Sequence, residues 1–247
     1  MRSRTTRAWA AAAGACVLLA FLSACTASGA TVSRDSRRFP FAGRNLTIEA
    51  HETRLTVVAG ERGEIAAERE LRGTAAADGN ASWTLRGDTL TIRVDCSGIV
   101  LSCESEHRVR VPEGIGLTVN GVGGAVRLEG LTGDVTARLG HDGTIRVVRP
   151  AGRLRLHSTG GHITVTDARS ARVEASTSGD GNIDLAFAAA PSRVEARAAG
   201  SVGITLPAGA ETYRIDAPGS DVPSDPRSDR VIVARAGDGA VTIRRDR

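Results

Sequence analysis

The chain has 247 residues, of which 41% are hydrophobic and 3% aromatic, and its formal net charge of +4 comes from 32 basic and 28 acidic residues. This length fits one domain or one continuous repeat structure. Basic and acidic residues are interspersed, and the sequence contains no basic stripe interleaved with the aromatic side chains that stack on bases, so it argues against a nucleic-acid partner.

The first 24 residues have the pattern of an export signal. Three arginines precede an apolar run over Ala10–Leu22, which is shorter than the roughly 20 residues needed to span a bilayer. The run ends in Leu22-Ser23-Ala24-Cys25, which resembles the lipobox of bacterial lipoproteins. The resemblance implies cleavage before Cys25 and attachment of a diacylglyceryl lipid, with fatty acids such as palmitate, to its sulfur. An ordinary secretory peptide is the alternative.

A lipid on Cys25 predicts a chain anchored in the cell membrane on its extracytoplasmic face. Loss of the signal and its arginines leaves the mature chain close to neutral, so the basic isoelectric point says little about partners. Residues 25–38 are rich in Ser, Thr, Ala, Gly and Arg, which predicts a flexible tether. We expect ordered structure to begin near Phe39.

Residues 39–116 predict β-strands at irregular spacing. Apolar and polar residues alternate, for example around Leu46 and Ile48 and around Leu90 and Ile92, as is typical of strands with one buried face. Stacked repeats need terminal units that hide their open ends. We therefore interpret this region as a less regular N-terminal β cap that is continuous with the repeats.

Cys96 and Cys103 are an even pair in a chain that carries an export signal, and they flank a short segment expected to be a loop. The oxidising compartment favours a disulfide between them. Closing so short a loop contributes about 2.5 kcal/mol in the chain-entropy estimate. A redox pair or a metal half-site is the alternative, although Cys-x-x-Cys spacing is absent and His107 adds only one ligand nearby.

Residues 117–247 contain a repeated pattern of turn residues, a glycine and a β-branched residue that opens an alternating run. Successive glycines are mostly 18 to 20 residues apart. Such a period indicates a chain that stacks similar units, and we expect the glycines to supply positive φ in the turns. The recurring glycines are Gly124, Gly143, Gly161, Gly181, Gly200, Gly219 (in a weaker copy) and Gly239.

Each period holds two short alternating runs, such as Leu154 with Leu156 and Ile163 with Val165. A hairpin meander is one interpretation of such a unit. The regular period favours a repetitive β-solenoid, a flattened β-helix or two-sheet stack with about 19–20 residues per coil. The all-β fold predicted in this way should stack like residues from successive periods, including Ile145, Ile163 and Ile183, into a ladder.

The period around Gly219 departs from this pattern. Asp216–Asp229 contains three prolines, which cannot donate hydrogen bonds to a β-ladder. We predict a loop that bulges from the stack at this point.

The sequence predicts no metal and no cofactor. His141, His157 and His162 lie in neighbouring periods, but His141 and His162 differ in their position relative to the repeat glycine, so turn and strand roles are favoured over a metal site. Asp-Gly pairs recur at the turns. The nine-residue period of calcium-binding β-rolls is absent, and Asp-Gly is a favoured tight-turn pair in its own right.

The sequence also lacks the motifs of several enzyme classes. It contains no Gly-x-Ser-x-Gly elbow, no His-Glu-x-x-His and no phosphate-binding Gly-Lys-Ser/Thr. We therefore expect a non-enzymatic protein without catalytic residues. Carboxylates paired across stacked coils, as in glycoside-cleaving enzymes, are the alternative, although the scarce aromatic residues are unlike a sugar-binding groove.

The unit over residues 172–185, with its echo in residues 154–165 and the Gly-Asp-Thr-Leu-Thr-Ile run over 87–92, resembles the β-strand repeats of the bacterial "putative adhesin" family, a domain of unknown function. The resemblance covers about residues 45–245. It implies stacked β-strands at the cell envelope and brings no agreed catalytic residues.

These features favour a lipid-anchored interaction scaffold whose polar face meets an unidentified envelope protein or polysaccharide. A β-helix polysaccharide hydrolase or lyase is the second hypothesis, and converging ionisable residues with perturbed pKa values in a groove would indicate it. A regulatory lipoprotein that modulates a membrane signalling partner is the third.

Overall fold

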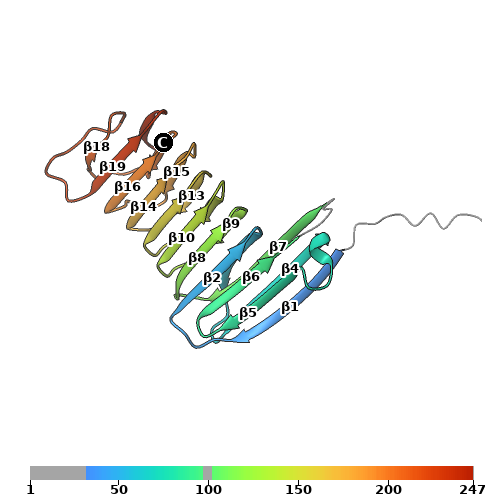
Figure 1. Cartoon of the computed structure of the whole chain (residues 1–247). Coiled ribbons are helices and arrows are strands. Elements are labelled where there is room, and N and C mark those ends of the chain that lie inside the picture. The colour runs from blue at the N-terminus through green and yellow to red at the C-terminus, as the bar shows by residue number, and fades with distance from the viewer. Residues whose placement is uncertain (1–31, 97–101, 247) are drawn as a thin grey trace, which may run out of the picture. The chain divides into compact units, whose positions relative to one another are not determined.

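The computed structural model describes residues 32–96 and 102–246, and these residues form an all-β structure with one short 3-10 turn, η1 (Thr74–Ala76). Their strands form two large sheets of ten strands each (Figure 1). None of these residues lies in a helix that is both long and apolar enough to cross a membrane. The lipobox, Leu22 to Cys25, falls outside the described residues.

The two sheets are named A and B, and their strands follow in spatial order. Sheet A contains β1 (Val32–Pro40), β4 (Glu64–Gly73), β7 (Cys103–Pro112), β3 (Arg54–Gly60), β9 (Ala125–Glu129), β11 (Thr144–Val148), β13 (Ile163–Ala168), β15 (Ile183–Phe187), β17 (Val202–Leu206) and β20 (Val241–Arg245). Sheet B contains β18 (Arg214–Asp216), β19 (Val231–Ala236), β16 (Arg193–Ala198), β14 (Arg172–Thr177), β12 (Leu154–Ser158), β10 (Val135–Gly140), β8 (Gly116–Val122), β2 (Asn45–His51), β6 (Thr89–Val94) and β5 (Ala81–Arg86).

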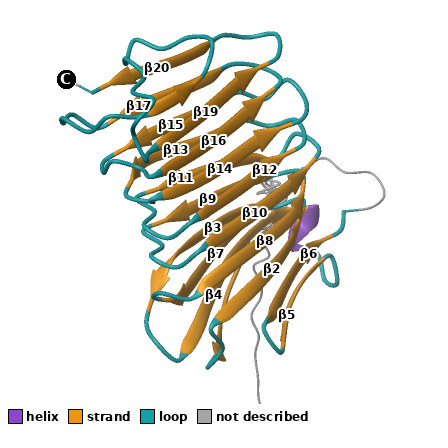
Figure 2. Ribbon diagram, turned by 90° about the vertical axis from the view of Figure 1, so that its left-hand side faces the viewer, coloured by secondary structure: helices purple, strands orange, loops and turns teal. Residues whose placement is uncertain are grey.

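From β8 to β17 the chain alternates between the two sheets, and each strand from β8 to β15 pairs in parallel with the strand one period later (Figure 2). Ile145 is level with Ile163, and Ile163 is level with Ile183. The predicted all-β two-sheet stack and its isoleucine ladder are therefore confirmed. The parallel pairing excludes the hairpin meander for this half of the molecule.

The inward side chains of both sheets bury one continuous apolar core. Full burial of an aliphatic side chain of this size contributes about 1.5–3 kcal/mol, so like residues stacked in register supply most of the stability of each level. One inward column of sheet A, which we call the core column, contains Leu55, Val126, Ile145, Ile163, Ile183, Val202 and Val241.

The repeat glycines are required by close approach of the turns, and the expectation of positive φ is wrong for most of them. A Cβ on Gly161 would lie 2.2 Å from the carbonyl oxygen of Gly143, and one on Gly181 would lie 2.3 Å from that of Gly161. Of the repeat glycines, Gly124 alone has a positive φ. The stacked turns therefore leave no room for a side chain on this line of residues.

The order of levels in the stack differs from the order in the sequence. β2 lies between β6 and β8 in sheet B, and β3 lies between β7 and β9 in sheet A (Figure 2). All four of these contacts are parallel. The predicted N-terminal cap thus contributes two full levels to the parallel stack, and its antiparallel pairing involves β1, β4, β5 and their neighbours.

The predicted tether overlaps the first strand, because β1 begins at Val32 and not near Phe39. β1 pairs antiparallel with β4 along its whole length, and Arg34 and Arg38 form ion pairs with Glu70 and Glu64 of that strand. Most of β1 is exposed at the edge of sheet A. Its sequence therefore lacks the apolar alternation that would have predicted a strand.

The proline-rich excursion predicted to bulge from the stack closes its C-terminal end. The levels on either side pair directly, with Arg193 level with Val231. In the segment between β17 and β19, which contains the excursion, β18 pairs with β19 at the edge of sheet B, and Asp221 N donates to the carbonyl oxygen of Ile243 at the edge of sheet A. Tyr213, in the same segment just before β18, is fully buried. The excursion is therefore a cap that contacts both sheets.

Candidate functional site

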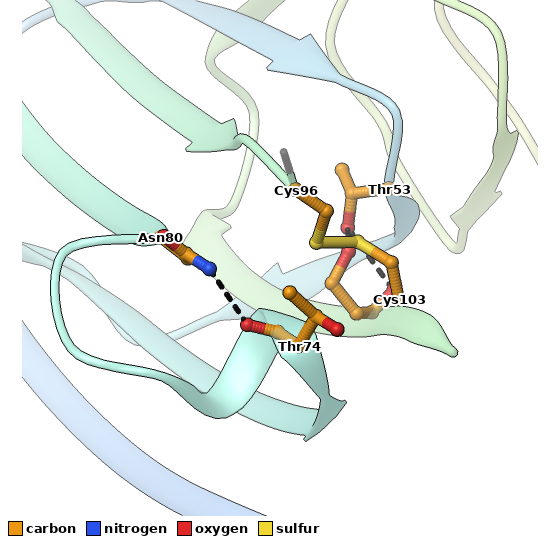
Figure 3. The surroundings of a disulfide bond; sticks show 6 residues. Thr53, Thr74, Asn80, Cys96 and Cys103 are labelled. Carbon is orange, nitrogen blue, oxygen red and sulfur yellow. Dashed lines mark hydrogen bonds between the residues drawn. A yellow bond between two sulfur atoms is a disulfide. The ribbon is translucent and has the colours of Figure 1, made fainter. Parts of the chain in front are cut away.

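The predicted disulfide joins Cys96 to Cys103, with Cα atoms 6.3 Å apart. It connects the chain just after β6 of sheet B to the first residue of β7 in sheet A. Figure 3 shows the bond beside Thr53 and η1, where Asn80 Nδ2 donates to the carbonyl oxygen of Thr74 at 2.9 Å. The separation of the Cα atoms is ordinary for a disulfide, so the bond forms without a shift of the backbone.

Next to the disulfide the core changes from apolar to polar. The core column continues beyond Leu55 to His107, Arg69 and Asp35, because each of these residues is level with the next. Arg69 Nη2 forms an ion pair with Asp35 Oδ2 at 3.3 Å. The core column therefore becomes polar over its last three strands. Polar side chains are expected there because the end of the stack is in contact with water.

His107 is 2% exposed and has one hydrogen-bonded ring nitrogen. Its Nδ1 lies 2.8 Å from Thr53 Oγ1, which also accepts a hydrogen bond from Ser105 Oγ at 2.9 Å. Burial, and then the charge of Arg69, lowers the pKa of His107 to about 4, so the imidazole is neutral at neutral pH. Its Nε2 is buried without a hydrogen-bond partner among the described residues.

Trp83 on β5 covers this end from sheet B and is 3% exposed. Its ring meets His107 edge-on, with ring centroids 6.1 Å apart. The Cζ atoms of Arg69 and Arg37 lie 4.7 Å and 6.0 Å from the centroid of the Trp83 ring. Each such cation–aromatic contact contributes about 0.5–2 kcal/mol. Because they cover the first levels of the core, we call Arg37, Arg69, Trp83 and His107 the N-terminal closure.

A hollow of about 740 Å³ lies across β1, β4, β7 and β3. Arginines hold its carboxylates, since Arg34 donates to Glu70 and Arg54 donates to Glu106. The hydrogen bonds from Arg34 and Arg72 lower the pKa of Glu70. A glycosidase needs one carboxyl group with a raised pKa as its general acid, so the shift at Glu70 has the wrong direction and this hollow does not favour the hydrolase hypothesis.

The three histidines of the repeats make contacts between strands or lie in turns. His157 Nδ1 lies 2.9 Å from Ser176 Oγ, and His162 Nδ1 accepts a hydrogen bond from Asn182 N at 2.9 Å. His141 occupies a turn position with φ of 51°. Within residues 32–96 and 102–246, no three His, Cys, Asp or Glu side chains gather as metal ligands would.

The outward positions of both sheets carry polar side chains in register. On sheet B, Thr47, Thr118 and Thr136 are level on adjacent strands. On sheet A, Arg127 and Arg146 are level in the same way. In the part of the chain that the structure describes, Val32 is the one large hydrophobic residue that is exposed. These faces are therefore suited to polar partners.

No family model and no curated protein sequence matches the chain. Solved structures show a similar arrangement of strands. A putative adhesin from Bacteroides fragilis is 15% identical with a TM-score of 0.50, covering 87% of this chain and 97% of that one. A putative adhesin from Parabacteroides distasonis is 9% identical with a TM-score of 0.44, covering 87% of this chain and 97% of that one. A putative lipid-binding protein from the same species is 11% identical with a TM-score of 0.44, covering 85% and 96%.

The B. fragilis structure supports a shared two-sheet all-β fold and nothing more specific, because its sequence identity is low. The protein therefore belongs to the all-β class, with two large sheets that share one main apolar core.

Sequence reasoning missed the N-terminal closure. It considered His107 only as an extra ligand beside the cysteines and gave Arg69 no role. The signal was present in β7, where Ser105, His107, Val109 and Val111 alternate with charged residues and are all buried. Alternation alone would have placed His107 inside, but its contact with Trp83 depends on pairing between distant strands.

Proposed function

We propose that this protein is a non-enzymatic lipoprotein of the bacterial cell envelope, an adhesin-like scaffold that presents a β-solenoid surface to another envelope component. The lipobox at Leu22-Ser23-Ala24-Cys25 supports a lipid anchor on Cys25. The parallel pairing of strands one period apart supports the solenoid. The name of the B. fragilis protein with the similar fold fits an adhesin-like role.

The observation that carries the interaction role is the register of polar side chains on the outer faces of one rigid core. Because these side chains are fixed at regular intervals, many weak polar contacts can form together along a partner, and their sum gives specificity. The partner is an envelope protein or polysaccharide and not a nucleic acid.

The length of chain between Cys25 and Val32 limits where the surface can act. Fully extended, this segment reaches at most about 25 Å, so a lipid on Cys25 keeps the start of β1 within that distance of the membrane. The protein would then sit on the extracytoplasmic face of the cell membrane and bind components close to it.

The anchor is tested by the Cys25→Ala variant expressed in a bacterial host that lipidates such signals. We expect the natural protein in the membrane fraction and labelled by a palmitate analogue, and the variant unlabelled and released. Cys16→Ala, in the apolar run of the signal, is the matched control and should keep both properties. Absence of label on the natural protein, or full label on Cys25→Ala, would contradict the anchor, even where an uncleaved signal retains the variant.

The interaction role is tested by chemical cross-linking of the lipidated protein in intact envelopes. We expect one reproducible cross-linked component. An excess of added purified protein should compete for this component and reduce its cross-linking to the anchored protein. Cross-links that are unaffected by this competition would show that the faces make no specific contact.

A further inference from the structure

Three arginines lie level with one another on the outer face of sheet B. Arg172 on β14 is the direct neighbour of Arg193 on β16. Arg153 precedes Leu154, which is level with Val173, so Arg153 is level with Arg172. Adjacent strands are about 4.8 Å apart, so the three side chains leave the backbone within about 10 Å of one another. We call Arg153, Arg172 and Arg193 the arginine column.

The column does not stabilise the sheet by itself, because like charges directly opposite one another are destabilising. Among the described residues, Arg193 is held by Glu195, with Nε 2.8 Å from Oε1. The Nε atom of Arg153 is buried without a hydrogen-bond partner, and Arg172 forms no ion pair with the described carboxylates. Adjacent like charges that lower stability in this way are expected where a surface has a function.

The arginine column lines a surface hollow of about 250 Å³ together with Arg155, Glu174 and Glu195. Hydrogen bonds from Arg193 and also from Arg197 lower the pKa of Glu195, so this carboxylate stays ionised and occupied by those two arginines. Glu174 lies only loosely against Arg155, at 3.9 Å. The hollow therefore keeps an excess of positive charge at Arg153 and Arg172.

We propose that the arginine column binds successive phosphate groups of a linear anionic polymer of the cell envelope. A guanidinium group presents a planar fork of N–H donors that matches phosphate oxygens, and neighbouring levels of the stack can share one phosphate or bind consecutive ones. This inference rests on the proposed interaction role and names the chemistry of the partner.

A polymer chain fits the hollow better than two other polyanionic surfaces do. A bilayer would favour apolar side chains for insertion, and the residues that line the hollow expose no large hydrophobic side chain. Single-stranded nucleic acid would favour aromatic platforms for its bases, and none of the lining residues is aromatic. The charges instead follow one line along the stack.

The proposal is tested by titrating the full-length protein, in detergent micelles, with fluorescein-labelled polyphosphate and measuring fluorescence anisotropy. We expect Arg172→Gln to weaken binding about tenfold and the double change Arg153→Gln with Arg172→Gln to weaken it about a hundredfold, since each removes charge-assisted hydrogen bonds. The slope of log affinity against log salt should fall by about one for each arginine removed.

Arg62→Gln, in the turn between β3 and β4, is the matched control, because it makes the same charge change at an exposed position outside the faces of both sheets. We expect its affinity for polyphosphate to equal that of the natural protein. Equal weakening by Arg62→Gln and Arg172→Gln would overturn the proposal, since net charge alone would then explain binding. Absence of polyphosphate binding, or tighter binding of polygalacturonate, would also overturn it. None of these results affects the cross-linking test or the Cys25 labelling test, so failure of this proposal is distinguishable from failure of the interaction role and from failure of the anchor.

Discussion

At the scale of single residues, His107 is the least expected member of the core. It occupies a position level with Leu55 in a column that is otherwise aliphatic toward the C-terminus. Its environment combines burial, the cation of Arg69 and the hydroxyl of Thr53 at 2.8 Å. Both burial and the neighbouring cation disfavour the imidazolium form, so the folded structure depends on a neutral ring.

This dependence predicts acid sensitivity. The folded-state pKa of about 4 lies below the ordinary value of 6.5, so the unfolded chain binds the extra proton between these values. The contribution of His107 to the free energy of unfolding is complete above pH 6.5, decreases as the pH falls toward 4 and levels off below that. The free energy of unfolding changes by up to about 3 kcal/mol over this range. Urea unfolding at several pH values measures it.

His107→Gln should remove most of this slope, whereas His51→Gln on β2 of sheet B should preserve it. Suppose instead that the free energy of unfolding falls by the same amount between about pH 7 and pH 4 in the natural protein and in His107→Gln. Groups other than His107 would then cause the acid sensitivity.

At the scale of elements, the turns set the spacing of the levels. A side chain on Gly161 would lie 2.2 Å from the carbonyl oxygen of Gly143, which is part of the backbone and cannot rotate away. A Cβ on Gly140, at the end of β10, would meet Gly121 O at an ordinary 3.7 Å. The structure therefore has room for a side chain at Gly140 but none at Gly161.

We expect Gly161→Ala to lower the free energy of unfolding by about 1–3 kcal/mol, as overpacking does elsewhere. Gly140→Ala, the matched control, should be neutral or stabilising by up to about 1 kcal/mol, because alanine restricts the unfolded chain. Urea denaturation of both variants measures the difference. Equal destabilisation would mean that backbone freedom and not close approach selects these glycines.

The features that could be predicted from the sequence are local or periodic. Alternation identified strands such as those containing Leu154 and Ile163, and the period placed Ile145, Ile163 and Ile183 in one ladder. The disulfide was predicted because Cys96 and Cys103, close in sequence, are an even pair after an export signal. Each depends on residues close in sequence or separated by one constant step.

The features that could not be predicted depend on pairing between distant segments. β1 carries no apolar alternation because its partner β4 holds it mainly by backbone bonds and surface ion pairs. The insertion of β2 between β6 and β8 leaves no trace in the local pattern. The proline-rich excursion was recognised as irregular, but the burial of Tyr213 follows from the open end of the core that it covers.

At the scale of the whole molecule, both ends of the described core are closed by segments outside the regular repeats. The N-terminal closure uses Trp83 and the arginines beside it. At the C-terminal end, Tyr213 is buried and Arg245 Cζ lies 5.7 Å from the centroid of its ring. Burial raises the pKa of the Tyr213 hydroxyl, which has no hydrogen-bond partner among the described residues. The ring, and not the hydroxyl, therefore provides the closure.

Tyr213→Ala should lower the free energy of unfolding by about 3–5 kcal/mol, the range for removal of a large buried aromatic ring. Tyr213→Phe should be neutral or stabilising, because it removes a buried hydroxyl that lacks a partner. Urea unfolding measures both changes, and size-exclusion chromatography should show larger species for Tyr213→Ala as the uncovered strand edges associate. A marked loss of stability in Tyr213→Phe would assign the closure to the hydroxyl instead.

The position of β2 and β3 within the stack has a consequence for biogenesis. These strands leave the ribosome before any of their parallel neighbours, since β6 begins at Thr89, β7 at Cys103 and β8 at Gly116. Pairings between segments so far apart form slowly. During synthesis these two strands must therefore wait with both edges unpaired, and we expect that interval, more than the later stepwise growth, to be when a folding helper or a protease meets this chain.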